Sequence, residues 1–201
     1  MKKIITNFDV PVLGNQLTKD ELIITLAFLL RGNYYTTKAY INLGDCRSFK
    51  YVSSVLENAC SNLNIPFSNL PSDSDCYRFY SWGQELKLIL AKQNLLPTRY
   101  SWKNMLHIPE QWIGQIDRRI LIDLLEFTFY ILKNKDAATK QIACQIHDHF
   151  ELERTLIELF KPIVPNIQIK YFNSLKSTCI LGISEEVINN LRNEDDFSDL
   201  L

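Results

Sequence analysis

The fold is decided by residues 26–33, which read LAFLLRGN, because they end an apolar helix and lead directly into a strand. We expect the helix to begin at Thr18, since Thr18 and Glu21 fit a capping box in which each side chain binds the other's backbone amide. Gly32 is a suitable stop. Residues 36–43 then alternate apolar and polar side chains, which is typical of a strand with one buried face.

The same pattern recurs 101 residues later, where residues 127–134 read FTFYILKN. A second apolar helix is expected from Asp117, a strand at 138–146 and another helix from Asp148 or His149, followed by strands at 167–172 and 177–183 and a final helix capped by Ser184. The offset superposes six positions, namely Phe28 on Phe129, Leu30 on Ile131, Asn33 on Asn134, Ile41 on Ile142, Phe49 on Phe150 and Leu56 on Ile157. A repeat of helix, strands and helix is the economical explanation.

In the first half, the strand at 36–43 is followed by an expected helix from Ser48 to Leu63, which carries apolar residues at intervals of three and four. Strands are expected at 67–70 and 76–80 and a helix at 84–95. The chain then divides into an arm, two repeats, a connection that should pack because it is apolar, and an acidic tail. Their residues are 1–17 for the arm, 18–96 and 117–193 for the repeats, 97–116 for the connection and 194–201 for the tail.

The composition is that of a soluble globular protein, with 46% apolar and 22% charged residues over 201 positions. Five widely spaced cysteines, an odd number without a CxxC pair, indicate free thiols in a reducing, intracellular compartment, and argue against a zinc knuckle or a disulfide framework. The start of the chain does not resemble a signal peptide, and no apolar run reaches the roughly 18 residues of a membrane helix, so no membrane partner is expected. The net charge of −1 gives no general attraction to nucleic acid.

Two such units in one chain resemble the LAGLIDADG homing endonuclease family in its single-chain, two-repeat form. The resemblance rests on the order of elements and on the apolar pattern, and it covers residues 18–193. It implies an α+β fold in which two pseudo-symmetric αββαββα repeats form a saddle-shaped antiparallel sheet with helices on one face. It also implies a monomer whose two signature helices pack against each other.

In that family, the residue at the end of each signature helix is an acid that binds a divalent metal beside the scissile phosphates. This sequence has Asn33 and Asn134 at those places. An amide is a poor substitute, because cleavage by a metal-activated water requires hard oxygen ligands. We therefore expect a catalytically degenerate protein without a cofactor, similar to a maturase or a ribonucleoprotein component.

Two alternatives stay open at these asparagines. An active, magnesium-dependent DNA endonuclease would need Asp136 or Asp45 to supply the missing carboxylate. Alternatively, Asn33 and Asn134 simply close their helices in a left-handed conformation, as asparagine often does.

The polar faces of the expected strands are candidates for a nucleic-acid surface. Their side chains donate and accept hydrogen bonds with few formal charges, which suits base edges and phosphates of DNA or structured RNA. The candidate residues are Lys38, Tyr40, Asn42, Arg78, Thr139, Gln141, Gln145, Gln168 and Lys170. An ordinary solvated sheet is equally compatible with the composition, and the resemblance is what favours nucleic acid.

Two other hypotheses are weaker. A protein-interaction module, with a protein partner in a larger complex, would also explain the near-neutral charge. The run His147-Asp148-His149 could suggest a metal or acid-base site, but Asp148 stands where a helix cap is wanted and no third ligand is visible at usable spacing.

Overall fold

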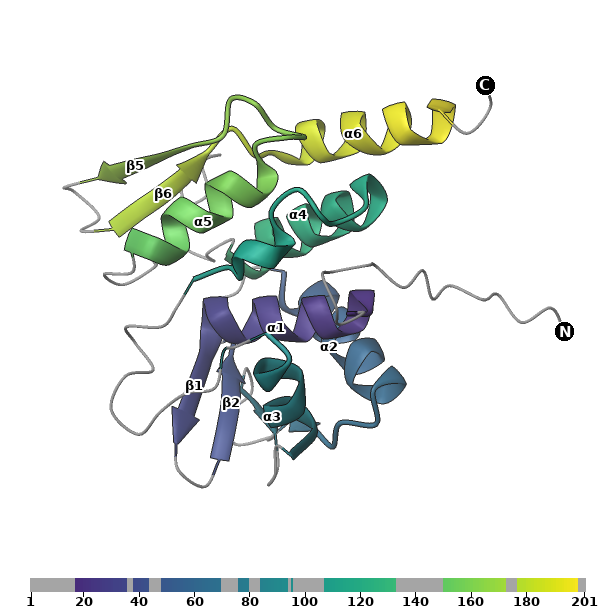
Figure 1. The fold of residues 1–201 in the computed structure, drawn as a ribbon, viewed down its shortest axis with the longest axis vertical. Helices are drawn as coiled ribbons and strands as arrows, with labels where there is room; N and C mark the ends of the chain where they lie inside the picture. The colour runs from purple at the N-terminus through teal and green to yellow at the C-terminus, as the bar shows by residue number, and fades with distance from the viewer. Residues whose placement is uncertain are drawn as a thin grey trace, which may run out of the picture.

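The computed structural model describes residues 17–35, 38–43, 48–69, 76–79, 84–93, 95, 107–132, 150–172 and 177–198. Most residues in regular elements are helical (Figure 1). The helices are α1 (Lys19–Arg31), α2 (Phe49–Asn62), α3 (Gln84–Ala91), the short η2 (Glu110–Trp112), α4 (Arg118–Leu132), α5 (Phe150–Phe160) and α6 (Glu185–Ser198). The strands are β1 (Gly32–Tyr35), β2 (Lys38–Asn42), β3 (Ser68–Asn69), β4 (Cys76–Phe79), β5 (Gln168–Phe172) and β6 (Ser177–Leu181).

Helix α1 begins with the predicted capping box. The Glu21 amide donates to Thr18 Oγ1 at 3.2 Å, and the Thr18 amide donates to Glu21 Oε2 at 2.8 Å. The Glu21 carboxylate is buried, and Lys92 Nζ donates to its other oxygen at 2.6 Å. Each of these contacts satisfies a group that would otherwise be costly to bury at the start of the helix.

The helix ends at Gly32, as predicted, but in an extended conformation with φ −78° and ψ 148°. Strand β1 starts at the same residue, and Asn33 pairs with Tyr40 of β2. The prediction that Asn33 closes the helix in a left-handed conformation is therefore wrong, because the chain passes from helix to strand before reaching it. Asn134 lies outside the described residues.

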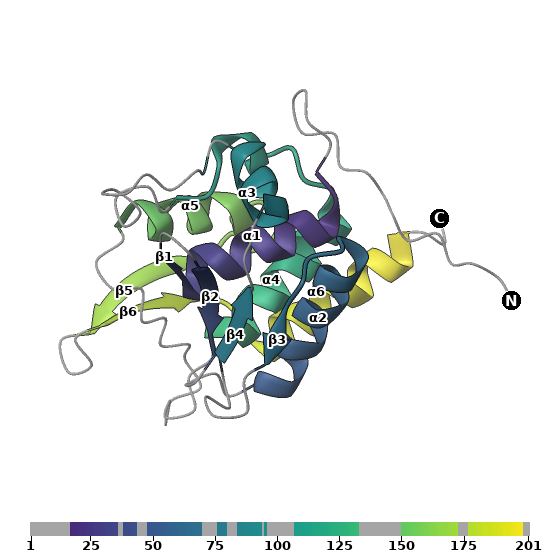
Figure 2. The same cartoon turned by 90° about the horizontal axis from the view of Figure 1, so that it is seen from below.

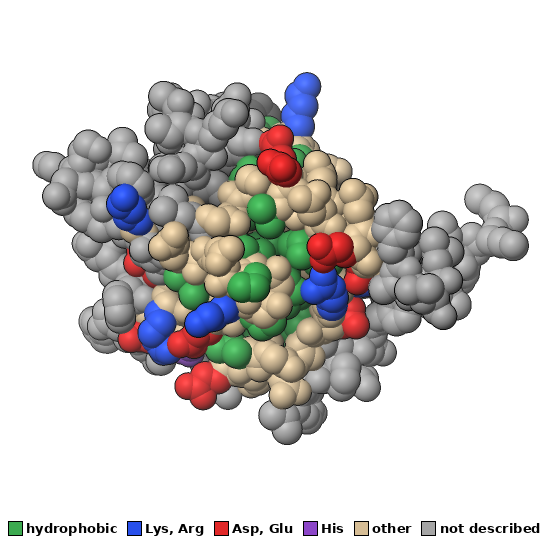
Figure 3. Space-filling view, turned by 90° about the horizontal axis from the view of Figure 1, so that it is seen from above, with side chains coloured by type: hydrophobic (Ala, Val, Ile, Leu, Met, Phe, Trp, Pro, Cys, Tyr) green, Lys and Arg blue, Asp and Glu red, His purple; other side chains and the backbone are tan. Residues whose placement is uncertain are grey.

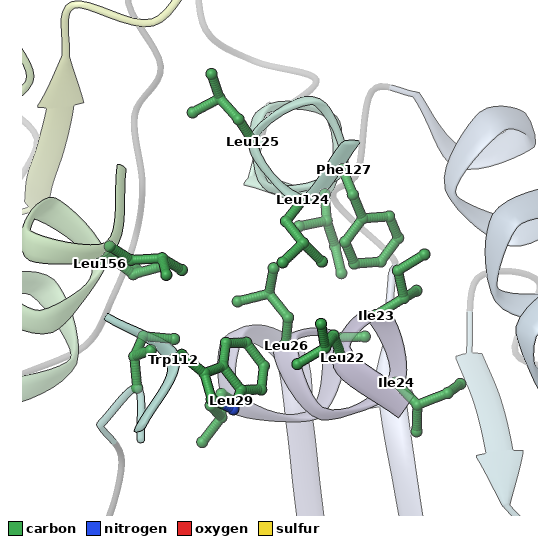
Figure 4. Close-up of a cluster of buried hydrophobic side chains, with 14 of the residues drawn as sticks. Leu22, Ile23, Ile24, Leu26, Leu29, Trp112, Leu124, Leu125, Phe127 and Leu156 are labelled. Atoms are coloured by element: carbon green, nitrogen blue, oxygen red, sulfur yellow. The ribbon is translucent and has the colours of Figure 1, made fainter. Parts of the chain in front are cut away.

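Helices α1 and α4 pack directly against each other at the centre of the molecule. Figure 4 shows Leu22 and Leu26 of α1 facing Leu124 and Phe127 of α4, and all four side chains are buried. At the far end of the pair, Arg31 Nε donates to the carbonyl oxygen of Ile131 at 3.2 Å. The two apolar helices found in the sequence thus form the middle of the core.

The strands form two separate antiparallel sheets, one of four strands in the order β1-β2-β4-β3 and one hairpin of β5 and β6. The prediction of a single saddle-shaped antiparallel sheet built from two αββαββα repeats is therefore wrong for the described chain, where helices predominate. Among the described strands, β5 and β6 pair only with each other. Alternation along a strand predicts that it is half-buried, but it does not say which strand pairs with it. The strand expected at 138–146 lies outside the described residues.

The connection between the halves packs into the core in its described part, residues 107–116. Trp112 is fully buried, and its Nε1 donates to Gln93 Oε1 at 3.0 Å. Gln93 Nε2 in turn donates to Thr25 Oγ1 of α1 at 2.7 Å and to the Ile89 carbonyl at 2.9 Å. These bonds satisfy the buried Gln93 amide at both its oxygen and its nitrogen, and they tie the connection to α1 and α3.

Helix α6 is attached to α4 by ion pairs along its length. Ser184 caps it as predicted, since the Val187 amide donates to Ser184 Oγ at 3.2 Å. The helix continues to Ser198, beyond the expected start of the acidic tail at 194. The paired acids are in this last part: Glu194 Oε2 lies 3.1 Å from Arg118 Nη2, and Asp195 Oδ2 lies 2.8 Å from Arg119 Nε.

A second ionic cluster lies further along α4. Arg192 Nη2 of α6 donates to Asp123 Oδ1 at 2.8 Å and also to Glu126 Oε2, and Lys19 of α1 donates to Asp123. Burial alone would lower the pKa of Arg192, but the hydrogen bonds to Glu126 and Asp123 outweigh burial and raise it above its ordinary value. Burial, together with the charge of Glu126, raises the pKa of the neighbouring Tyr51. The cluster therefore joins three helices through charges that balance one another.

Within the part of the chain that the structure describes, no helix is both long enough and apolar enough to cross a bilayer.

We expect Gly32→Ala to destabilise the protein by about 3 kcal/mol, because a Cβ at this position would lie 2.3 Å from the Phe28 carbonyl oxygen. Gly114→Ala is the control, since Gly114 has φ +73° and nothing within 4 Å of the added methyl, so it should cost only the strain of about 1 kcal/mol. Urea denaturation measures both. An equal loss for the two variants would contradict this account of Gly32.

Removing the Arg192 charge, as in Arg192→Gln, should lower the free energy of unfolding by about 1–2 kcal/mol, because it leaves two half-buried carboxylates facing each other. The matched control is Arg154→Gln. Its partners Glu151 and Glu158 are exposed and lie on the same helix, α5, so these ion pairs join no second element. Chemical denaturation should show a smaller loss for this control. A larger loss for the control would mean that the cluster around Arg192 does not hold α6.

Candidate nucleic-acid interface

The register of the four-stranded sheet places Asn33, Tyr40, Arg78 and Ser68 in one row, one residue from each of its strands. The next rows on the same side of the sheet pair Tyr35 with Lys38, and Asn42 with Cys76. Residues opposite each other in an antiparallel pair share a face of the sheet. We call these eight positions the polar face, and they are Asn33, Tyr35, Lys38, Tyr40, Asn42, Ser68, Cys76 and Arg78.

The opposite face is the one that packs on α1. Ile41 is fully buried there, and its partner Gly32 lies against Phe28 of α1. Because residues along a strand alternate between the two faces, the positions that alternate with Ile41 belong to the face turned away from α1. Figure 2 shows β1, β2, β4 and β3 in a row with α1 behind them.

The two faces differ chiefly in that only the polar face has basic residues among its described positions. The polar face combines two basic residues, two tyrosines, two asparagines, a serine and a cysteine. It has no acidic residue among its described positions. The face toward α1 has Gly32, Tyr34, Ala39, Ile41, Asn69, Tyr77 and Phe79. In a chain with 23 acidic residues, a sheet face without any acid can accept a negatively charged partner without local repulsion.

The predicted site residues, both the binding candidates and the possible metal ligands, fall into three groups. Lys38, Tyr40, Asn42 and Arg78 are brought together on the polar face. Gln168 and Lys170 are exposed on β5 in the separate hairpin, where they alternate with Ile169, the partner of the buried Ile180. The remaining candidates, Thr139, Gln141, Gln145, Asp45, Asn134 and Asp136, lie outside the described residues, as do His147, Asp148 and His149.

Sequence reasoning did not include Asn33, Tyr35, Ser68 or Cys76 in the surface. For Asn33 and Tyr35 the reason is that β1 begins at Gly32, whereas the sequence placed the first strand at 36–43. Ser68 and Cys76 lie within the expected strands and were not chosen as binding residues. Two adjacent tyrosines, Tyr34 and Tyr35, were the available signal, since aromatic residues favour strands.

The described charged groups between α4 and α6 are engaged in ion pairs with one another. Asp123 and Glu126 are both bound by Arg192, and the described residues contain no group of three or more side chains placed to hold a metal ion. In Figure 3, the charged side chains of the visible described surface stand mostly in neighbouring pairs of opposite sign around a hydrophobic centre. Such a surface offers no extended positive area to a nucleic acid.

Comparison with known proteins assigns no family to this chain. No protein-family model matches the sequence, and no curated protein does either. Among solved structures, full-length DUF199/WhiA from Thermatoga maritima is similar, with 14% sequence identity and a TM-score of 0.46. The match covers 93% of this chain and 63% of that protein, so the chain spans less than two thirds of its length.

A similarity at this identity and TM-score supports neither a family nor a function. The sequence-based identification with the LAGLIDADG homing endonuclease family is therefore corrected, because no family model matches and the described strands do not form its sheet. The sites of that family cannot be transferred to Asn33 and Asn134. The candidate interface that remains is the polar face of the four-stranded sheet.

Proposed function

We propose that this protein binds nucleic acid through the polar face and does not cleave it. The observation that supports the proposal is the register of β1, β2 and β4, which collects Lys38, Tyr40 and Arg78 on the side of the sheet turned away from α1. Lysine and arginine bind phosphates and guanine, and asparagine can pair with adenine. The face thus combines side chains that can bind the phosphate backbone of a nucleic acid with side chains that can bind its nucleobases.

The absence of cleavage is proposed from the same set of residues. Metal-dependent hydrolysis of a phosphodiester needs carboxylate oxygens to hold the metal. The described positions of the polar face have amide, hydroxyl, thiol and basic side chains, but no carboxylate. These groups can bind a phosphate but are poor ligands for a magnesium ion.

Fluorescence anisotropy with labelled RNA and DNA oligonucleotides tests the binding. The double variant Lys38→Ala, Arg78→Ala should bind at least ten-fold more weakly than the unchanged protein, and its affinity should depend less on salt, because two phosphate contacts are lost. Arg154→Ala with Lys161→Ala, which removes two exposed bases from α5 and its end, is the matched control and should bind normally. Equal binding by both double variants would contradict the proposal, and absence of binding at low salt would favour a protein partner.

Incubation of the same oligonucleotides and of plasmid DNA with the protein and magnesium tests the second part. We expect the nucleic acids to remain intact on a denaturing gel. Breaks that require magnesium and disappear in the Lys38→Ala, Arg78→Ala variant would show that the protein is a nuclease, and would overturn this part of the proposal.

A further inference from the structure

We infer that the nucleic acid bound by the polar face is a single strand, with its bases stacked on Tyr40 and Tyr35. This inference rests on the proposed function and names the substrate class of the same surface. Three features of the sheet support it: its width, its small charge and the register positions of its tyrosines.

The width of the sheet is unsuited to a duplex groove. Neighbouring strands lie about 4.8 Å apart, so the outer strands of four are separated by roughly 14 Å before side chains are added. The major groove of a DNA duplex is about 12 Å wide and admits one helix or a two-stranded ribbon. A sheet in the order β1-β2-β4-β3 is too broad to enter it, whereas a single strand can lie across the face.

The charge of the polar face is also too small for a duplex. Proteins that neutralise six to ten phosphates bind a duplex strongly at low salt, and each phosphate contact needs a lysine or arginine side chain. Among the described positions of the face, only Lys38 and Arg78 are basic, and the whole chain carries a net charge of −1. Binding must therefore draw on contacts other than charge, and base stacking is the main such contact in single-strand binders.

The register places each of the two tyrosines opposite a basic residue. Tyr40 is in the middle of its row, with Asn33 on one neighbouring strand and Arg78 on the other. Tyr35 is the direct partner of Lys38. Each tyrosine thus has a basic residue as its cross-strand neighbour. The tyrosine can stack with a nucleobase while the neighbouring lysine or arginine binds the adjoining phosphate.

Competition between single strands and a duplex tests this inference. Twelve-nucleotide RNA and DNA of mixed sequence should bind at least ten-fold more tightly than the same DNA sequence in a duplex. The logarithm of the affinity should fall with the logarithm of the salt concentration at a slope of about −1.4, the value for two phosphates on a single strand. Tighter binding to the duplex would overturn the inference and leave the proposed function in place, whereas absence of binding to any oligonucleotide would overturn both.

Substitution of Tyr40 tests the stacking itself. Tyr40→Leu should weaken binding to the single strands about ten-fold, whereas Tyr40→Phe, which keeps the ring, should stay within about two-fold of the unchanged protein. Circular dichroism checks that both variants are folded. Equal affinities of the two variants would contradict stacking at Tyr40.

A measurement on the unchanged protein avoids any folding defect. Ultraviolet irradiation of its complex with a uridine oligonucleotide, followed by trypsin and mass spectrometry, should attach the oligonucleotide to the peptide of residues 39–47, which contains Tyr40. Crosslinks found only on peptides of α5 or α6 would place the strand elsewhere and overturn the inference.

Discussion

The packing of α1 against α4 is the contact on which the rest of the structure depends. It buries the centre of both helices and is joined at one end by Lys19 with Asp123 and at the other by the Arg31 guanidinium with the Ile131 carbonyl. Since β1 begins at the residue where α1 ends, the sheet has no loop through which to change its direction. A side chain at Gly32 would meet the Phe28 carbonyl oxygen, so this junction requires glycine, and α1 leads directly into the sheet that carries the polar face.

Around this helix pair, buried polar contacts add to the apolar packing and are satisfied by neighbouring groups. Gln93 connects α1 to Trp112 of the connection, and Ile108 donates its amide to Thr155 of α5 at 2.9 Å. Buried hydrogen bonds of this kind add little net stability, but they are costly to break and so favour one arrangement of the elements. A binding surface on strands benefits from such support, because its groups keep their spacing before the ligand arrives.

Local features of this fold could be predicted from the sequence, and long-range ones could not. The capping box of Thr18 and Glu21, the helix end at Gly32 and the Ser184 cap each depend on a few neighbouring residues, and the structure has all three. The grouping of Lys38, Tyr40 and Asn42 follows from alternation. Strand partners depend on contacts between distant segments, so the single saddle-shaped sheet was wrong and Asn33 was interpreted as a helix end instead of a sheet residue. Repeated apolar patterns also occur in unrelated helical cores. The recurrence of the 26–33 pattern at 127–134 therefore did not establish a family.

The central claim is that the polar face of the sheet is the nucleic-acid surface, and amide chemical shifts measured during titration with a single-stranded oligonucleotide test it most directly. The account predicts that the largest shift changes fall on β1, β2 and β4, with small changes on α6, whose acids are paired with Arg118 and Arg119. Shift changes concentrated on α5 or α6, with β1, β2 and β4 unaffected, would contradict it.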